Sequence, residues 1–295
     1  MVKGQAPLDF QGREAPDAIL VCSANRTLLE PIWPLSAGVR WVHSRWAGIE
    51  NLLFPALVES DVVVTNGRGS FAESLAEFVM AAVLFFAKDL RRMRKSQAEG
   101  RWDPFDPEWV KARTLGILGY GEIGRAAAMR AKAFGMRVIG VRRRPEHAAG
   151  DPLLDEALPS TSTGRLELMR RSDYVLVCTP LTPETRGLVG AAELQAMKAS
   201  GVLINVGRGA CVDEPALVDV LRAGRIRGAA LDVFEREPLP AGHALFSLDN
   251  VLLSPHCADH VPGWLDDAMA LFLDNLERFR QGAPLLNVVD KRAGY

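Results

Sequence analysis

The chain has 295 residues and a formal charge of −1, with 35 Lys and Arg against 36 Asp and Glu, and 48% of its residues are hydrophobic. This balance excludes a bulk basic nucleic-acid binder, because no net positive field would attract phosphates. It also argues against disorder, which needs low hydrophobicity and high net charge. The length allows a full hydrophobic core and predicts two domains.

The sequence offers no segment suited to a membrane. Its longest stretch without charged or polar residues, 78–87, has ten residues, whereas a helix that crosses a bilayer needs about 20. Residues 1–16 mix charges with glycine and proline and lack the apolar core of a secretory signal. No CxxC spacing of the kind that binds zinc joins the four cysteines, which are Cys22, Cys178, Cys211 and Cys257. We therefore expect a cytoplasmic protein with reduced thiols, no metal site, and neither a membrane nor a nucleic-acid partner.

In the first third of the chain, short apolar runs bounded by turn or polar residues predict buried strands. These runs are 18–22, 39–43 and 62–65. Residues 71–95 then predict one long helix, because acidic residues lie early in it and Arg and Lys close it, which suits the helix dipole. A loop rich in Trp, Asp and Pro follows at 100–107.

The remainder of the chain repeats this alternation of strand-like and helix-like segments. The predicted strands are 115–118, 137–141, 174–178, 202–205, 228–232 and 251–253. The predicted helices are 122–134, 166–170, 191–198, 214–223 and 264–280. Repeated alternation of this kind predicts a parallel sheet covered by helices on both faces.

A glycine-rich loop links the strand at 115–118 to an alanine-rich helix. Its residues are Gly119, Tyr120, Gly121, Glu122, Ile123 and Gly124. Between a strand and a helix, this GxGxxG pattern predicts a dinucleotide site. Gly119 would allow the tight turn, Gly121 would let the backbone approach a pyrophosphate, and Gly124 would permit close packing of helix and strand. The N–H groups at the helix N-terminus would bind the phosphates. The alternative is an ordinary glycine-rich turn.

The next strand ends in a run of arginines. An NAD enzyme usually places Asp or Glu here, on the ribose hydroxyls. This chain has Arg142, Arg143 and Arg144, and no acidic residue before Glu146. A guanidinium suits a ribose 2′-phosphate, which its planar fork can bind. We therefore expect NADP(H) in preference to NAD(H), although a solvated basic corner would also explain the run.

Three further segments place polar or charged residues where predicted strands end, which is the usual ligand edge of a parallel sheet. They read NVGRG at 205–209, LDVFEREPLP at 231–240 and SPHCA at 254–258, and CTPLTPETR follows another strand at 178–186. With the glycine loop upstream, this ordered set resembles the D-isomer-specific 2-hydroxyacid dehydrogenase family from about Asp17 to the end of the chain. Within that family, 44–48 and 66–78 make it most similar to the NADP-dependent glyoxylate/hydroxypyruvate reductases.

The resemblance implies a catalytic set of three residues. Arg208 would bind the substrate carboxylate and polarise the C2 oxygen, and Glu237 would hydrogen-bond His256, which exchanges a proton with that oxygen. Histidine suits this step because it titrates near neutrality. A carboxylate partner orients the ring and favours its protonated form, while a guanidinium stabilises a developing alkoxide without losing a proton. Each residue alone would more simply be a solvated loop residue.

The resemblance also implies binding residues around this set. On the cofactor side, Asp232 would meet the nicotinamide carboxamide and Val206 would offer a neighbouring backbone contact, with Thr179 and Pro180 in the loop under the cofactor. On the substrate side, backbone N–H groups near Gly67 and Arg68 would hold the substrate carboxylate, and Trp46 would line the pocket. The Arg68 side chain would either add a second positive contact or point to solvent.

The fold that the resemblance implies is a doubly wound parallel sheet of Rossmann type in the cofactor domain, with a smaller, flavodoxin-like substrate domain. The substrate domain would comprise 1–88 and 258–295, and the dinucleotide-binding domain 89–257. Family members usually begin with a strand, a helix and another strand before the segment that matches Asp17, so the substrate domain is expected to be shortened at its N-terminal side. Family members are commonly homodimers, and a homodimer is expected here.

Two other functions stay open. One is a non-catalytic dinucleotide-sensing or partner-binding protein on the same fold, an alternative prompted by the shortened N-terminal part. The other is a dehydrogenase of another acid, such as phosphite, 3-phosphoglycerate or a bulkier 2-keto acid. Turnover of NADPH with a panel of 2-keto acids would separate these functions.

Overall fold

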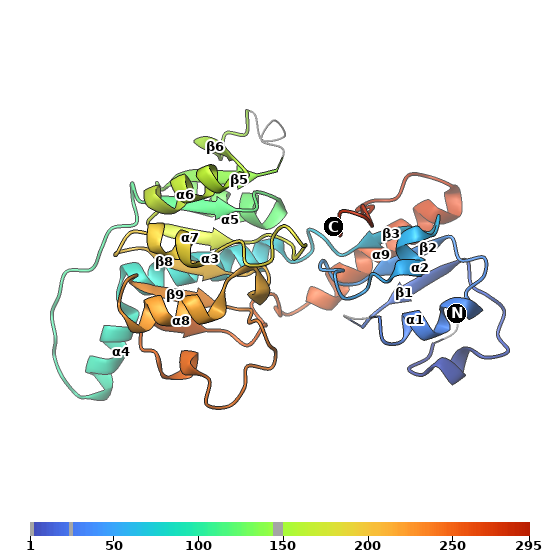
Figure 1. The fold of residues 1–295 in the computed structure, drawn as a ribbon, viewed down its shortest axis with the longest axis horizontal. Coiled ribbons are helices and arrows are strands. Elements are labelled where there is room, and N and C mark those ends of the chain that lie inside the picture. The colour runs from blue at the N-terminus through green and yellow to red at the C-terminus, as the bar shows by residue number, and fades with distance from the viewer. Residues whose placement is uncertain (1–2, 24–25, 144–149) are drawn as a thin grey trace. The chain divides into compact units, whose positions relative to one another are not determined.

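The computed structural model describes residues 3–23, 26–143 and 150–295. The chain forms two compact units, a smaller one of Met1–Phe71 with Pro262–Tyr295 and a larger one of Ala72–Val261 (Figure 1). Arg144 and Glu146, which entered the argument on cofactor choice, lie outside the described residues. Within the described part of the chain, no helix is both long and apolar enough to span a bilayer.

The larger unit is built on a sheet of seven parallel strands in the order β10-β9-β8-β7-β4-β5-β6. The strands are β4 (Thr114–Leu118), β5 (Arg137–Arg142), β6 (Glu156–Pro159), β7 (Tyr174–Val177), β8 (Val202–Asn205), β9 (Gly228–Leu231) and β10 (Val251–Leu253). Every residue of β7, β8 and β9 is buried, as expected for strands covered on both faces. Strand β6 was not predicted, because it lies at the edge with alternating exposure and has no continuous apolar run.

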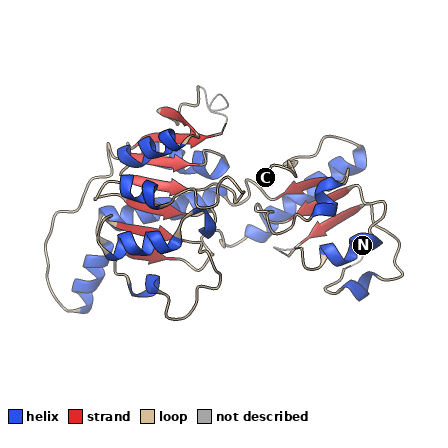
Figure 2. Ribbon diagram, viewed as in Figure 1, coloured by secondary structure: helices blue, strands red, loops and turns tan. Residues whose placement is uncertain are grey.

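Helices cover both faces of this sheet (Figures 1 and 2). They are α3 (Ala72–Ala87), α5 (Glu122–Ala133), α6 (Ser162–Arg171), α7 (Ala191–Ala196) and α8 (Glu214–Arg222), whereas α4 (Leu90–Ala98) follows α3 and lies to the side of the sheet. Helix α3 packs against α5, while α6, α7 and α8 pack against one another in chain order. The prediction of a doubly wound parallel sheet is thereby confirmed.

The prediction of one helix over 71–95 is wrong. Helix α3 ends at Ala87, and α4 begins at Leu90 after Asp89, whose φ of 46° lies in the left-handed region. The Asp89 carboxylate accepts a hydrogen bond from the backbone N–H of Arg92 and so caps α4. The break separates the buried apolar helix α3 from the basic, mostly exposed helix α4, which a charge pattern alone does not reveal.

The smaller unit holds three parallel strands in the order β1-β2-β3, namely β1 (Ala18–Val21), β2 (Trp41–Ser44) and β3 (Val63–Asn66). The central strand β2 is buried on both faces. Val42 packs into a core shared with α1 (Leu29–Ile32) and α2 (Pro55–Glu59), two short helices that were not predicted. Trp41, on the other face, stacks on Phe272 of α9 (Trp264–Gln281) with ring centroids 5.5 Å apart.

The units divide the chain at other residues than the predicted domains. The sequence placed 1–88 in the first domain, but α3 belongs to the larger unit because it packs on α5. At the second crossing, Ala258 is held within the larger unit by the Ser74 hydroxyl, which donates to its carbonyl at 2.5 Å. The larger unit therefore extends to Val261. Which unit binds which ligand stays a prediction.

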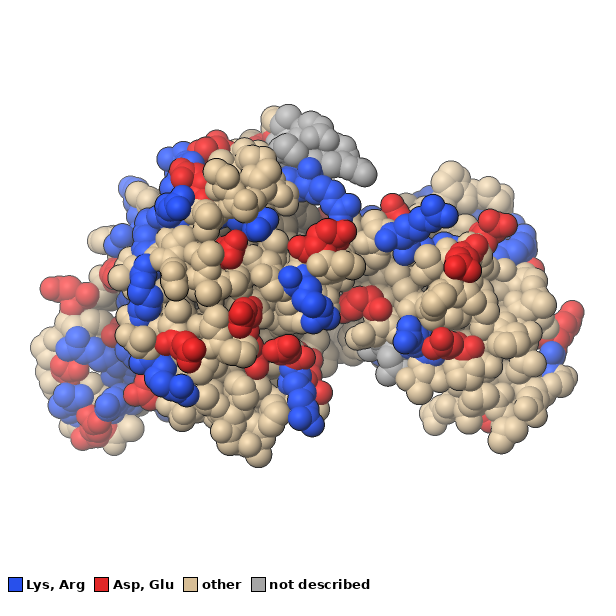
Figure 3. All heavy atoms as spheres, in the orientation of Figure 1, with Lys and Arg blue, Asp and Glu red and all other residues tan. Residues whose placement is uncertain are grey.

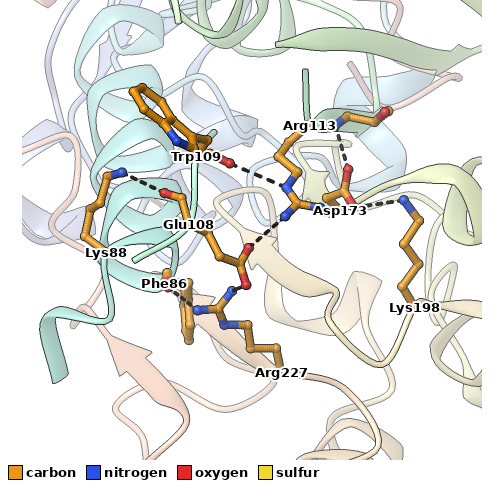
Figure 4. A network of polar contacts seen from close by, with 9 residues as sticks. Phe86, Lys88, Glu108, Trp109, Arg113, Asp173, Lys198 and Arg227 are labelled. Carbon is orange, nitrogen blue, oxygen red and sulfur yellow. Dashed lines mark hydrogen bonds and ion pairs between the residues drawn. The ribbon is translucent and has the colours of Figure 1, made fainter. Parts of the chain in front are cut away.

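A network of charged residues ties together the amino ends of the strands in the larger unit (Figure 4). Glu108 accepts from Arg227, before β9, at 2.8 Å and from Arg113, before β4, at 3.3 Å. Asp173, before β7, accepts from Lys198 at 2.8 Å. Elsewhere, basic and acidic side chains are interspersed over the visible faces of both units (Figure 3). These ion pairs lie at the edge of the sheet opposite the carboxyl ends of the strands.

Candidate active site

The predicted cofactor and catalytic residues of the larger unit follow the strands of its sheet at the carboxyl ends. Gly119 follows β4, Thr179 follows β7, Arg208 follows β8, Asp232 follows β9 and His256 follows β10. Because all these strands are parallel, their carboxyl ends meet at one edge, where ligands of open α/β sheets bind. The sheet therefore brings together residues that are far apart in the sequence.

The three glycines of the loop after β4 have distinct geometries. Gly119 has φ = +96°, and a Cβ there would lie 2.9 Å from the Thr179 backbone nitrogen, so only glycine fits. A Cβ at Gly124 would lie 2.9 Å from the Gly119 carbonyl oxygen, which reflects close packing of α5 on the turn. A Cβ at Gly121 would meet no heavy atom within 4 Å. The space beside Gly121 is thus open.

Helix α5 begins directly at this open space. Its N-cap residue is Gly121, and no side chain caps it, so the first N–H groups of the helix have no intrahelical acceptor. Glu122 and Ile123 form the first turn. Open space, a glycine backbone and an uncapped helix N-terminus together fit a dinucleotide pyrophosphate. The ring of Tyr120 is buried instead, and its hydroxyl donates to Asp151 at 3.0 Å.

The basic residues at the end of β5 are half-buried Arg142 and exposed Arg143. Arg142 forms no ion pair within the part of the chain that the structure describes. Arg143 lies within electrostatic range of Glu184 in the loop after β7. The pKa of Glu184 is lowered mainly by a hydrogen bond from the Thr182 hydroxyl, and more weakly by the Arg143 charge. The structure thus places positive charge beside that loop.

Glu237 and His256 form a close pair. The His256 Nδ1 lies 2.6 Å from Glu237 Oε2, and the other carboxylate oxygen of Glu237 accepts from the Phe234 backbone N–H at 2.9 Å. The hydrogen bond that His256 donates to Glu237 raises the pKa of His256, against the opposing effect of burial. Burial would raise the pKa of Glu237, but the bonds from His256 and Phe234 outweigh it, so that pKa is lowered. The pair favours a protonated imidazole bound to a carboxylate, with Nε2 left for a substrate.

Arg208 lies close enough to act on both members of this pair, since its charge lowers the pKa of His256 and of Glu237. Asn205, the last residue of β8, shapes the turn: its amide donates to the Arg208 carbonyl at 3.1 Å, and its carbonyl accepts from Gly207 at 3.0 Å. The three residues that the resemblance implied as catalytic are therefore brought together at the carboxyl edge.

Asp232 has a structural task that the sequence did not reveal. It is 1% exposed, and its Oδ1 accepts from the Ser254 hydroxyl at 2.6 Å and from the backbone N–H groups of Cys257 and Ala258 at 3.0 and 3.1 Å. These bonds hold the turn on both sides of His256, whose φ is +52°. No local sequence signal pairs Asp232 with residues 22 to 26 positions later.

The other cofactor-side residues are placed mainly through their backbones. Val206 is 4% exposed and its N–H donates to the Val177 carbonyl, so its side chain belongs to the core. The Thr179 hydroxyl faces the thiol of Cys211 at 3.5 Å, and the Pro180 carbonyl accepts from Thr185 at 2.6 Å. The four cysteines form no disulfide. No cluster of three or more metal-ligating side chains occurs among the described residues.

The predicted substrate-side residues lie in the smaller unit, after β2 and β3. The Gly67 N–H already donates to the Trp46 carbonyl at 3.1 Å. It is therefore not free for the substrate carboxylate that the resemblance implied there. The Arg68 N–H makes only a 3.4 Å contact with Asn66. The exposed side chain of Arg68 reaches Asn287 Oδ1 at 3.4 Å. Trp46 is held by a hydrogen bond from its indole to the Cys22 carbonyl.

The chain is similar to known proteins of one family. Residues 80–258 match the family model described as D-isomer specific 2-hydroxyacid dehydrogenase, NAD binding domain. A glyoxylate reductase of Aeropyrum pernix is 36% identical over 86% of this chain and 77% of that protein. A D-3-phosphoglycerate dehydrogenase of Methanocaldococcus jannaschii is 33% identical over 82% of this chain, which spans 46% of that protein's length.

A solved structure covers nearly the whole chain. It is an NADPH-dependent glyoxylate/hydroxypyruvate reductase of Sinorhizobium meliloti in complex with NADP and sulfate. Its TM-score is 0.83 at 28% sequence identity, with 97% of this chain and 89% of that chain covered.

Proposed function

The chain belongs to the D-isomer specific 2-hydroxyacid dehydrogenase family, a family of oxidoreductases, and we propose that it reduces a small 2-keto acid such as glyoxylate or hydroxypyruvate with NADPH. The observation that carries this proposal is the 2.6 Å pair of Glu237 and His256, next to Arg208 at the carboxyl edge of the larger sheet. An acid, its carboxylate partner and a cation at one edge are the groups that reduction of a ketone requires.

The chain's own residues supply the proton and the charge stabilisation. A reduced nicotinamide dinucleotide bound at the glycine loop supplies the hydride for C2. Arg208 binds the carboxylate of the substrate and stabilises negative charge on the C2 oxygen. His256, held through Nδ1 by Glu237, gives the proton from Nε2 to that oxygen, and Glu237 stabilises the imidazolium beforehand. Reduction thus depends on a protonated His256.

Arg142 and Arg143 support the choice of NADP(H). Arg142 ends β5, where an acidic residue would bind the ribose of NAD, and it has no ion-pair partner among the described residues. A guanidinium there offers donors to a 2′-phosphate. The Sinorhizobium meliloti relative, described as NADPH-dependent, supports the same choice.

A homodimer in the cytoplasm is the second part of the proposal. Residues 101–110 run without regular secondary structure and loop away from the sheet of the larger unit (Figure 1). Trp102 and Trp109 in this segment are 95% and 78% exposed, and aromatic side chains are typical anchors of interfaces. The four unpaired cysteines support a reducing compartment. Light scattering of the wild type and of Trp102→Ser tests the dimer, since a monomer in both would contradict it.

The activity is tested by following NADPH and NADH consumption with a panel of 2-keto acids. We expect turnover with glyoxylate or hydroxypyruvate, faster with NADPH, and a loss of about 100-fold or more in His256→Ala. His243→Ala is a matched control, because His243 also faces a glutamate, Glu214, at 3.3 Å but is not part of the proposed site. It should keep activity within about threefold.

Two results would contradict the proposal. Turnover of none of the acids with either cofactor would exclude the reductase. Tight NADPH binding without turnover would instead favour a dinucleotide-sensing protein on the same fold.

A further inference from the structure

A carboxylate of the larger unit is bonded to the glycine loop after β4. Asp151 lies before β6, and its side chain is 14% exposed. Its Oδ2 accepts from the Tyr120 hydroxyl and from Arg125 Nε, both at 3.0 Å, and its Oδ1 accepts from the Leu153 backbone N–H at 3.1 Å. Burial would raise the pKa of Asp151, but these bonds and the Arg125 charge outweigh it, so that pKa is lowered. Asp151 is therefore ionised, and Arg125 compensates its charge.

The glycine loop also joins this carboxylate to the end of β5. The first two backbone N–H groups of the loop donate to the Val141 carbonyl at 3.1 and 3.4 Å, directly before Arg142. Burial raises the pKa of the Tyr120 hydroxyl, the bond to Asp151 raises it further, and the Arg142 charge opposes both. Asp151 and Arg142 thus act on one hydroxyl from opposite signs of charge. Among the described residues, Asp151 nevertheless pairs with Arg125 alone, and Arg142 has no ion-pair partner.

The ion pair of Arg125 and Asp151 affects how a ligand meets Arg142. An Asp151 carboxylate without its partner would attract the Arg142 guanidinium and repel a phosphate bound to it, because opposite charges attract and like charges repel over such distances. The Arg125 side chain is 56% exposed, and exposed ion pairs contribute little to the stability of a fold. The electrostatic effect of Arg125 can therefore be measured in a protein that still folds.

We propose that Arg125 maintains a preference for NADPH over NADH by holding the Asp151 carboxylate, so that the Arg142 guanidinium is left for the ribose 2′-phosphate. This inference rests on the proposed function, which places that phosphate at Arg142. Arg125 is a positioning residue, because it acts on the phosphate through Asp151 and Arg142 and does not touch it. All of these side chains belong to the larger unit.

Two nucleotides that differ only in the 2′-phosphate test this proposal without turnover. Calorimetry compares 2′,5′-ADP, which carries the 2′-phosphate, with 5′-AMP. The wild type should bind 2′,5′-ADP about tenfold or more tightly than 5′-AMP, as a charge-assisted hydrogen bond provides. Arg125→Met keeps an unbranched apolar stem and removes the charge. It should lower this preference by about fivefold or more, with a change of less than about threefold in the affinity for 5′-AMP.

Removal of the carboxylate should reverse this loss. Asp151→Asn keeps oxygen acceptors for Tyr120 and Leu153 and removes the negative charge. Combined with Arg125→Met, it should return the preference to within about threefold of the wild type, and alone it should leave the preference intact. Lys132→Met is the matched control, because Lys132 is also on α5 and pairs with Asp155 at 2.6 Å. It should leave the preference unchanged.

Four results would overturn the proposal. The first is the absence of a preference for 2′,5′-ADP in the wild type. The second is an equal loss for both nucleotides in Arg125→Met, which would make Arg125 a ligand of the phosphate that they share. The third is a double variant that stays as impaired as Arg125→Met. The fourth is a weaker binding of 5′-AMP by Asp151→Asn alone, which would assign the carboxylate to the ribose hydroxyls.

Kinetics of the same variants separate this proposal from the proposed function. The ratio of kcat/KM with NADPH to that with NADH should fall in Arg125→Met by about fivefold or more and recover in the double variant. If the nucleotides bind as expected while no keto acid is turned over, the role of Arg125 stands and the proposed activity is wrong. If keto acids are reduced with the same cofactor preference in the wild type and Arg125→Met, the activity stands and the role of Arg125 is refuted.

Discussion

A buried histidine should make the stability of this protein depend on pH in a defined direction. His43, in the central strand of the smaller unit, is fully buried. The Trp41 indole donates to the Thr65 hydroxyl at 2.8 Å, so the hydroxyl proton is left for His43 Nδ1 at 2.7 Å. The ring proton is then on Nε2, which is buried without a partner. His43 is therefore neutral in the folded protein.

Burial lowers the pKa of His43 from 6.5 to about 4. Because the folded pKa is depressed, the unfolded chain binds a proton that the folded chain does not. The stabilisation that goes with a neutral His43 is therefore fully present above pH 6.5 and is lost as the pH falls toward about 4. At ~1.4 kcal/mol per pKa unit, the complete loss is about 3 kcal/mol. Most of it, about 2 kcal/mol, should appear between about pH 7 and pH 4.5.

The variant His43→Phe keeps an aromatic ring against Phe272 and removes the titrating group. Urea unfolding followed by circular dichroism gives the free energy of unfolding of both proteins at each pH. Other ionisable groups are shared and cancel in the comparison. Between about pH 7 and pH 4.5, the free energy of unfolding should decrease less in the variant than in the wild type, by about 2 kcal/mol. Equal decreases would refute the assignment of a neutral, desolvated His43.

Three further predictions concern the proposed site. Glu237→Gln should lower kcat by about 10- to 100-fold. It should also move the alkaline fall of the reduction rate to lower pH, because it removes the hydrogen bond that raises the pKa of His256. An unchanged pH profile would exclude this coupling. Gly121→Ala should weaken NADPH binding in calorimetry with little change in melting temperature, whereas Gly119→Ala should lower the melting temperature. Of these two residues, only Gly119 lacks room for a Cβ and has positive φ. The reverse order of effects would contradict the loop geometry. Arg142→Gln should raise the KM for NADPH by about tenfold and leave that for NADH nearly unchanged, so an equal effect on both would remove Arg142 from the 2′-phosphate site.

Most strands and the long helices could be predicted because their signals are local. Buried parallel strands appear as short apolar runs, and the glycine loop reports its own backbone needs, such as the positive φ of Gly119. The elements that were missed lack such signals. The edge strand β6 has no continuous apolar run, and the break at Asp89 depends on a left-handed backbone conformation at a non-glycine residue.

By itself, the sequence determined the alternating fold, the dinucleotide loop and the set of residues at the strand ends. Only the tertiary structure decided which partner each polar group has. Asp232 holds the turn around His256, and the Gly67 N–H donates to the Trp46 carbonyl. The physical reason is that hydrogen bonds, burial and pKa shifts depend on distances between segments that only packing brings together.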